Sequence, residues 1–221
     1  MKNEKIFEGK KILITSGPVW VPIDKVRIIT SIFGGALGVV MAEKAREMGA
    51  DILLLMGPGR AKIEGGQNLK VIKFKYFDEL FSVMKKEISS KKYDVIIHSA
   101  AVPDYVPEKV FAGKIKSGKK DLIIRMKPTQ KIVDYIKKWD SSVILVKFKL
   151  EVNSNEKDLI ETAKKSMARS KAEIIVANDL LKMTKDKHPA FIIDNERIKK
   201  VSTKDHLAEE LLKIINSKLK P

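Results

Sequence analysis

The chain has 221 residues, of which 44% are hydrophobic and 33% charged, and it contains no cysteine. This composition is typical of a globular protein with a sizeable core, and it excludes disulfides, thiolate metal sites and a cysteine nucleophile. The net charge is +16, but lysines and acidic residues are mixed along amphipathic segments, so nucleic-acid binding is not favoured. The first ten residues are charged and the apolar runs are only as long as strands, which predicts a cytoplasmic protein without a membrane span.

Strand-like and helix-like segments alternate along the chain. An apolar run at 11–17 precedes a helical pattern that begins at 36 and closes on Gly49. Further strands are expected at 50–57, 70–75, 93–102, 142–150 and 172–179, and further helices at 77–88, 130–139, 156–170 and 203–219. Residues 190–201 predict a hairpin that turns at Asp194 and Asn195, and Thr203 is expected to cap the last helix.

This alternation predicts an α/β fold in a single domain over residues 1–221. The sheet is expected to be doubly wound, mostly parallel and Rossmann-like, with helices on both faces and a C-terminal hairpin. Ligands bind such sheets beyond the carboxyl ends of the strands, so the polar residues that follow each strand form the candidate site.

Gly34 and Gly35 come directly before the first predicted helix. Their position would expose backbone N–H groups at the positive end of the helix dipole, where phosphate is stabilised. Tight packing of the helix on its strand explains the same glycines equally well, and the stretch matches neither common phosphate-binding fingerprint.

The segment that follows the strand at 93–102 is the second candidate. Asp104 could hold Mg²⁺ or a ribose hydroxyl. Lys114 and Lys116 lie in a glycine-containing loop at about 111–121 that is expected to be flexible and could close over a triphosphate. A solvated basic loop is the alternative. His98 ends an apolar strand and is expected to be a hydrogen-bonded core residue rather than a catalyst.

Four stretches together resemble one enzyme family. "TSGPVWVPIDKVR", "AAVPDYVPEKVFAGKIKS", "VKFKLE" and "IIVAND", in this order, resemble phosphopantothenoylcysteine synthetase, the phosphopantothenate–cysteine ligase of coenzyme A biosynthesis. The resemblance runs from about residue 10 to the final helix. "FKLE" is similar to the stand-alone members, which implies the form without a flavin-dependent decarboxylase domain.

The resemblance implies a nucleotide-dependent ligase that joins 4′-phosphopantothenate to cysteine through an acyl-nucleotide intermediate. It also implies CTP or ATP as co-substrate, Mg²⁺, and a homodimer in which one subunit completes the site of the other. Lys114 and Ser31 would be the catalytic residues. The substrate would be bound by Arg27, Gly34, Gly35 and Ala101, and the nucleotide by Asp104, Lys114, Gln130, Lys131, Ile132, Val133 and Phe148. The metal ligands remain open.

The chain departs from the family pattern at several of these positions. Ser31 stands where the family has an Asn that holds the intermediate, and Phe33 and Gly34 replace a pair of hydroxyl residues. Loss of one preorganised donor typically costs about 3 kcal/mol at a transition state. A pair of helical lysines found in CTP-using bacterial members corresponds here to Ser166 and Ser170. Two interpretations follow: a working ligase of a divergent branch, or a paralogue that keeps the fold and a phosphate pocket with altered or lost activity.

Overall fold

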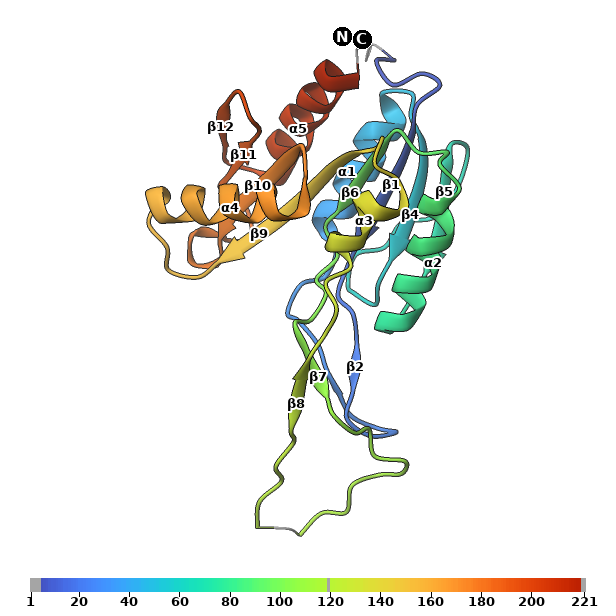
Figure 1. Cartoon of the computed structure of the whole chain (residues 1–221), viewed down its shortest axis with the longest axis vertical. Coiled ribbons are helices and arrows are strands. Elements are labelled where there is room, and N and C mark those ends of the chain that lie inside the picture. Colours follow the sequence, from blue (N-terminus) through green and yellow to red (C-terminus); the bar gives the residue numbers. More distant parts are fainter. Residues whose placement is uncertain (1–4, 119, 220–221) are drawn as a thin grey trace.

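The computed structural model describes residues 5–118 and 120–219 and is built on an eight-stranded sheet (Figure 1). The strand order is β12-β11-β10-β9-β6-β1-β4-β5. The strands are β1 (Lys11–Ser16), β4 (Asp51–Met56), β5 (Leu69–Lys73), β6 (Val95–His98), β9 (Ile144–Glu151), β10 (Ile174–Asp179), β11 (Ala190–Ile193) and β12 (Ile198–Val201). All pairs from β10 to β5 are parallel, whereas β11 and β12 form the predicted antiparallel hairpin. The predicted doubly wound α/β fold is confirmed.

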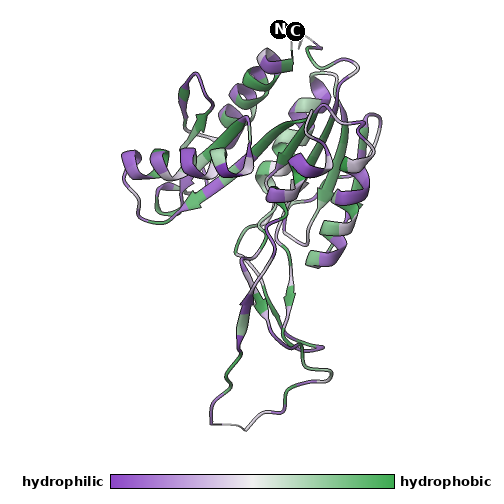
Figure 2. Ribbon diagram, viewed as in Figure 1, coloured by the Kyte–Doolittle hydropathy of each residue, from purple (hydrophilic) through white to green (hydrophobic). Residues whose placement is uncertain are grey.

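Helices cover both faces of the sheet. One face carries α1 (Ala36–Glu47) and α5 (Lys204–Leu219), and the other carries α2 (Phe77–Ser89), α3 (Val133–Trp139) and α4 (Glu156–Ser170). Consecutive side chains of a strand point to opposite faces of the sheet. Ile12 and Ile14 therefore pack with α1 and α5, while Leu13 packs toward α2. Burial on both faces explains why these strands are continuous apolar runs, as the hydropathy colouring shows (Figure 2).

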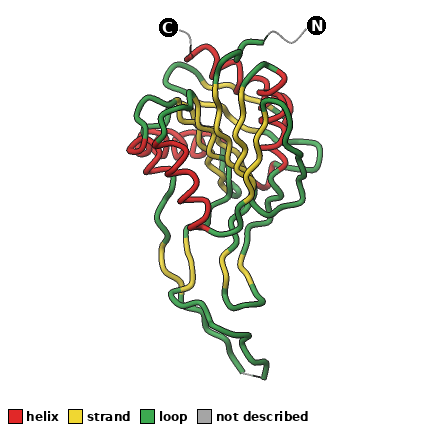
Figure 3. Tube along the Cα trace, turned by 90° about the vertical axis from the view of Figure 1, so that its right-hand side faces the viewer, coloured by secondary structure: helices red, strands yellow, loops and turns green. Residues whose placement is uncertain are grey.

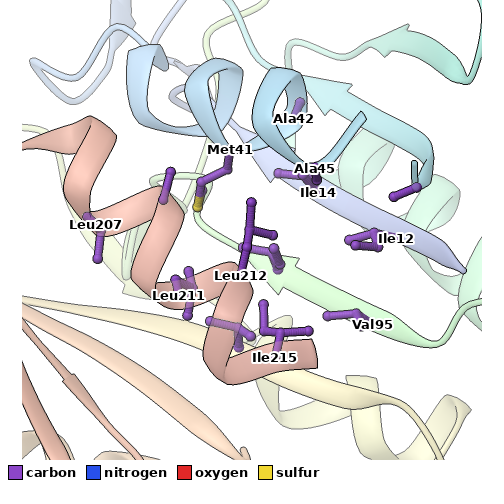
Figure 4. Close-up of a cluster of buried hydrophobic side chains, with 14 of the residues drawn as sticks. Ile12, Ile14, Met41, Ala42, Ala45, Val95, Leu207, Leu211, Leu212 and Ile215 are labelled. Atoms are coloured by element: carbon purple, nitrogen blue, oxygen red, sulfur yellow. The ribbon is translucent and has the colours of Figure 1, made fainter. Parts of the chain in front are cut away.

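Side chains of α1 and α5 pack together with the apolar strand residues on one face of the sheet. They form the larger of the two hydrophobic cores. Met41 and Ala45 of α1 meet Leu211, Leu212 and Ile215 of α5 above the sheet (Figure 4). Gly49 has a φ of +94°, which lets the chain leave α1 and enter β4, as its position predicted. The Thr203 hydroxyl accepts a hydrogen bond from the His206 N–H at 3.1 Å, which confirms the predicted cap of α5.

The main differences from the predicted boundaries are at β6, α3 and the C-terminal turn. β6 ends at His98 rather than 102, because the chain then crosses the end of β1, with the Ala101 N–H donating to the Gly17 carbonyl at 3.0 Å. α3 begins at Val133 rather than 130. The C-terminal turn has four residues, 194–197, because the Asp194 carboxylate accepts the N–H groups of Glu196 and Arg197.

An arm made of residues 18–33 and 102–129 extends from the carboxyl end of the sheet (Figures 1 and 3). It contains two short antiparallel pairs, β2 (Val21–Pro22) with β3 (Ile28–Ile29) and β7 (Tyr105–Pro107) with β8 (Met126–Pro128). The predicted loop at 111–121 lies on this arm, and its residue 119 is outside the described residues. The paired strands of the arm were not predicted.

A buried carboxylate joins the two halves of the arm. Asp24 accepts hydrogen bonds from the N–H groups of Val26 and Arg27 in its own half. It also accepts the Ile115 N–H at 2.9 Å from the other half and forms an ion pair with the Arg27 guanidinium. The Ile115 N–H contributes most to holding the pKa of Asp24 far below its usual range. The arm is therefore a connected unit rather than two independent loops.

No helix within 5–118 or 120–219 is long and apolar enough to cross a membrane.

Candidate active site

A cavity of about 530 Å³ lies at the carboxyl ends of the strands, where the fold predicts a ligand site. The ends of β1, β6, β9 and β10 form its floor, and the first residues of α1 and the segment before α3 form its walls. The base of the arm borders the cavity through Val102, Pro103 and Asp104.

The α1 wall is fixed by close glycine contacts. Gly35 has a φ of +85°, and a Cβ added there would lie 3.2 Å from the backbone of Gly17. A Cβ on Gly38 would lie 2.2 Å from the Ser16 Oγ, which itself donates to the Gly35 carbonyl at 2.8 Å. These glycines therefore pack the helix tightly on β1. Gly35 and Gly38 also line the cavity, so the packing explanation is confirmed for Gly35, while phosphate binding at this wall stays a prediction.

The start of α1 suits an anion. Its first turn contains no acidic residue, and no side chain among residues 5–118 and 120–219 caps it. The first N–H groups of a helix lack partners within the helix and carry its positive partial charge. This wall can accept a phosphate group.

His98 lies on the floor, 9% exposed, with its Nδ1 2.9 Å from the Thr15 Oγ1. Burial, and to a smaller extent Lys147, lowers its pKa to about 4. The imidazole is therefore neutral at pH 7. The prediction that His98 is a hydrogen-bonded core residue is confirmed, although it also borders the cavity.

A group of cations lies between β9, α3 and α4. The Lys147 side chain is 5% exposed, and its ammonium donates to the Ser166 carbonyl at 3.1 Å. Burial lowers the pKa of Lys147 to about 8, and Arg169 adds the next largest effect. Lys131 is 3.5 Å from the Asp104 carboxylate. This end of the cavity presents hydrogen-bond donors.

The other end of the cavity is formed by Asn178, Met183, His188 and Lys204. His188 is 5% exposed, and its Nδ1 has no hydrogen-bond partner in the described part of the chain. Burial, with Lys204 nearby, lowers the pKa of His188 to about 4, so this imidazole is also neutral at pH 7.

The structure brings nine of the twelve predicted site residues to this one cavity. They are Gly34, Gly35, Ala101, Asp104, Gln130, Lys131, Ile132, Val133 and Phe148. The other three, Arg27, Ser31 and Lys114, do not line it.

Those three residues lie on the arm. The Arg27 guanidinium pairs with Asp24 and donates to the Ile115 carbonyl at 3.4 Å. Lys114 is exposed. The Ser31 Oγ is buried without a partner among the residues that the structure describes.

Lys147, Arg169 and His188 are among the cavity residues that sequence reasoning missed. Lys147 could have been found, because it directly follows an apolar run, residues 143–146, that predicts a buried strand. His188 lies in a loop whose fold against the start of α5 has no local sequence signal.

Asp104 carries the sole carboxylate among the described residues that line the cavity. Within those residues no group of three or more His, Asp or Glu side chains could hold a metal ion. A divalent cation would fit here only with ligands supplied largely by a bound phosphate chain, as Mg²⁺ commonly binds.

Fold and site together define a Rossmann-like α/β protein with a basic cavity at the carboxyl edge of its sheet. The chain belongs to the family described as DNA/pantothenate metabolism flavoprotein C-terminal domain, whose family model matches residues 7–219. The family predicted from the four sequence stretches is confirmed.

Several curated relatives are named for coenzyme A biosynthesis. The chain is 33% identical over 211 residues to the coenzyme A biosynthesis bifunctional protein CoaBC of Thermococcus kodakarensis, covering 95% of this chain and 51% of that protein. It is 30% identical over 217 residues to the protein of the same name in Methanocaldococcus jannaschii, covering 96% of this chain and 52% of that protein. The chain thus spans about half the length of these relatives.

A solved structure of the DNA/pantothenate metabolism flavoprotein from Streptococcus pneumoniae matches with a TM-score of 0.87 at 30% identity, covering 95% of this chain and 99% of that one. The C-terminal domain of a coenzyme A biosynthesis bifunctional protein CoaBC matches with a TM-score of 0.80 at 26% identity, covering 98% of each chain.

Proposed function

We propose that this protein is a nucleotide-dependent ligase that joins 4′-phosphopantothenate to cysteine in coenzyme A biosynthesis. The two curated relatives described above carry the name of that biosynthesis, and nine of the twelve residues that the sequence resemblance assigns to the site lie around one cavity.

The convergence of those residues is the observation that carries the proposal. They come from widely separated segments: residues 34–35, 101–104, 130–133 and 148. Only folding brings them together, and it brings them to the edge of the sheet where ligands bind. The α1 wall offers N–H groups for phosphate, and the α3–α4 side adds cations.

The reaction requires two displacements. First, the carboxylate of 4′-phosphopantothenate attacks the α-phosphorus of CTP or ATP, and pyrophosphate leaves. Next, the cysteine amine attacks the acyl carbon, the nucleoside monophosphate leaves, and the amine gives up a proton. Lys114 would offset the charge that develops at phosphorus, and Ser31 would hold the acyl-nucleotide. Asp104, with the phosphate oxygens, would bind Mg²⁺, which shields the negative charge of the triphosphate.

The arm supports the homodimer in this proposal. Arg27 and Lys114 lie on the arm rather than around the cavity of their own chain. The arm also exposes large apolar side chains, among them Val26 at 65%, Ile32 at 82% and Ile123 at 82%. Apolar side chains exposed on a projection are typical of a surface that another subunit covers. A second copy of this chain would bury them and would bring a lysine and an arginine to the partner's cavity.

One observation favours the alternative, a paralogue with altered or lost ligase activity. Phe33 lines the cavity beside Gly34, where the resemblance predicts a hydroxyl residue, and its ring takes space that a polar side chain would leave to water or substrate.

A measurement of pyrophosphate release distinguishes a working ligase from a paralogue with altered or lost activity. The protein is incubated with 4′-phosphopantothenate, Mg²⁺ and either CTP or ATP, with and without cysteine. We expect pyrophosphate with one of the nucleotides, and phosphopantothenoylcysteine only when cysteine is added. Nucleotide binding with no pyrophosphate under any of these conditions would favour the paralogue.

A further inference from the structure

Lys147 is a buried cation without a counter-ion. It is 5% exposed, and among the described residues no carboxylate lies within 4.0 Å of its ammonium. One of its three N–H donors is used by the Ser166 carbonyl, and the side chain lines the cavity. An ammonium in such a position is costly unless an electron-rich group meets it.

The surroundings increase this cost. Arg169 lies on the same side of the cavity and repels Lys147, as do Lys131 and Lys149, whereas Asp134 attracts it. Lys131 and Lys149 each have a carboxylate partner, at 3.5 Å and 3.0 Å. Arg169 has no ion-pair partner in the described ranges. Lys147 and Arg169 are therefore two cations without a carboxylate partner in the described ranges, and the buried Lys147 still has two N–H donors for a ligand.

The position of the pair in the sheet separates it from the phosphate-binding wall. Side chains alternate along β9, so Val146 and Phe148 pack toward α1 and α5, while Leu145 and Lys147 face α3 and α4. The α1 N-terminus lies on the opposite face from Lys147. A nucleotide whose phosphates meet α1 would extend its base across the edge of the sheet toward α3 and α4.

We infer that Lys147, with Arg169 beside it, binds a carbonyl oxygen on the base of the nucleotide and so determines which nucleotide is accepted. The inference rests on the proposed function. Both side chains are donors only, and cytosine and uracil carry a ring carbonyl whereas adenine carries none. The pair therefore favours a pyrimidine nucleotide over ATP.

The test measures nucleotide binding without 4′-phosphopantothenate, so that no reaction occurs. Dissociation constants for CTP, UTP, ATP and inorganic triphosphate are measured by calorimetry on the full chain with Mg²⁺. Lys147→Met keeps the buried aliphatic stem and removes the ammonium. Lys165→Met serves as the matched control, because Lys165 lies on the same helix as Arg169 but is 75% exposed and paired with Glu161.

We expect Lys147→Met to weaken CTP and UTP binding about tenfold or more while ATP and inorganic triphosphate change little. Arg169 is exposed, so Arg169→Met is expected to keep the fold. It is expected to change the ratio of the CTP and ATP dissociation constants in the same direction as Lys147→Met. If Lys147→Met fails to fold, the Arg169 variant provides the test. Lys165→Met is expected to leave every dissociation constant unchanged.

If Lys147→Met weakened the binding of all four ligands equally, Lys147 would contact a phosphate rather than the base. That result would overturn the inference. An unchanged CTP-to-ATP ratio in both the Lys147 and Arg169 variants would also overturn it, while the proposed function would stand. A parent protein that binds none of the nucleotides would overturn the proposed function and this inference together.

Discussion

At the scale of single residues, the positions directly before α1 bear most on whether the protein has the proposed ligase activity. Ser31 has a buried hydroxyl without a partner in the described chain, and Phe33 lines the cavity two residues later. A buried polar atom without a partner is a natural place for a ligand contact. A hydroxyl offers one donor, whereas the amide of an asparagine offers two.

Substitution at Ser31 tests whether this hydroxyl serves the reaction. Ser31→Asn is expected to preserve or raise the rate of pyrophosphate release, because the amide adds a preorganised donor worth up to about 3 kcal/mol at the transition state. The rate is measured for the parent, for Ser31→Asn, and for Ser31→Asn combined with Phe33→Ser. Activity in the double variant alone would mean that the ring of Phe33 blocks the site. Inactivity in all three, with nucleotide still bound, would favour the paralogue.

At the scale of structural elements, the arm borders the cavity at its base through Phe33, residues 102–104 and Thr129, while Arg27 and Lys114 lie elsewhere on the arm. Asp24 holds the two halves of the arm together, and the sheet and α1 build the cavity without Arg27 or Lys114. Suppose that each arm contributes to the cavity of the partner subunit. In a mixed dimer, one subunit then has a defective arm and an intact cavity, and the other has an intact arm and a defective cavity. The intact arm meets the intact cavity, so each mixed dimer has one intact site.

Mixing two inactive variants tests this arrangement. Lys114→Ala and Phe148→Ala are each expected to lower the rate of acyl-nucleotide formation a hundredfold or more, on the order of the loss of one transition-state contact. Mixed dimers of the two are expected to recover a substantial part of the parental rate. Lys116→Ala, exposed in the same loop as Lys114, serves as the control and should keep the parental rate.

A mixture that stays inactive although dimers form would mean that each arm acts on its own cavity. Full activity of Lys114→Ala alone would remove this lysine from the mechanism.

At the scale of the whole molecule, charge and burial act in different ways. The net charge of +16 draws anionic substrates toward the protein from a distance.

The two buried histidines, His98 and His188, are neutral in the folded state, and this couples stability to pH. Burial lowers both pKa values to about 4, below the value of about 6.5 that an unfolded chain shows.

The free energy of unfolding is therefore expected to fall as the pH drops from 6.5 to 4. In that window the unfolded state takes up protons that the folded state does not, and each histidine removes about 2 kcal/mol by pH 5. Denaturant titrations at pH 7 and pH 5 measure the loss, and the variant His98→Gln, His188→Gln should lose about 4 kcal/mol less than the parent. An equal loss in parent and variant would show that these histidines are not responsible.

The sequence predicts the sheet and its helices well because the buried parallel strands are mainly apolar and the helices have strong amphipathic patterns. The helix at 156–170 was predicted at its observed bounds. The arm could not be predicted, because β2 and β3 have two residues each and the hydrogen bond that joins its halves, from Ile115 to Asp24, spans 91 positions of the chain. The resemblance led us to expect lost cations at Ser166 and Ser170. Only the folded chain shows a lysine from β9 donating to the Ser166 carbonyl.

The close contact of α1 with β1 has a consequence for how this site can change over evolutionary time. Gly35 and Gly38 approach Gly17 and Ser16 so closely that almost any side chain there would displace the helix. Ser31 and Phe33 precede this contact in the chain, and both positions already carry side chains. We expect substitution at these two positions to change the chemistry of the site while the packing of α1 on β1 persists. A lineage could therefore acquire a new substrate here without passing through an unfolded ancestor.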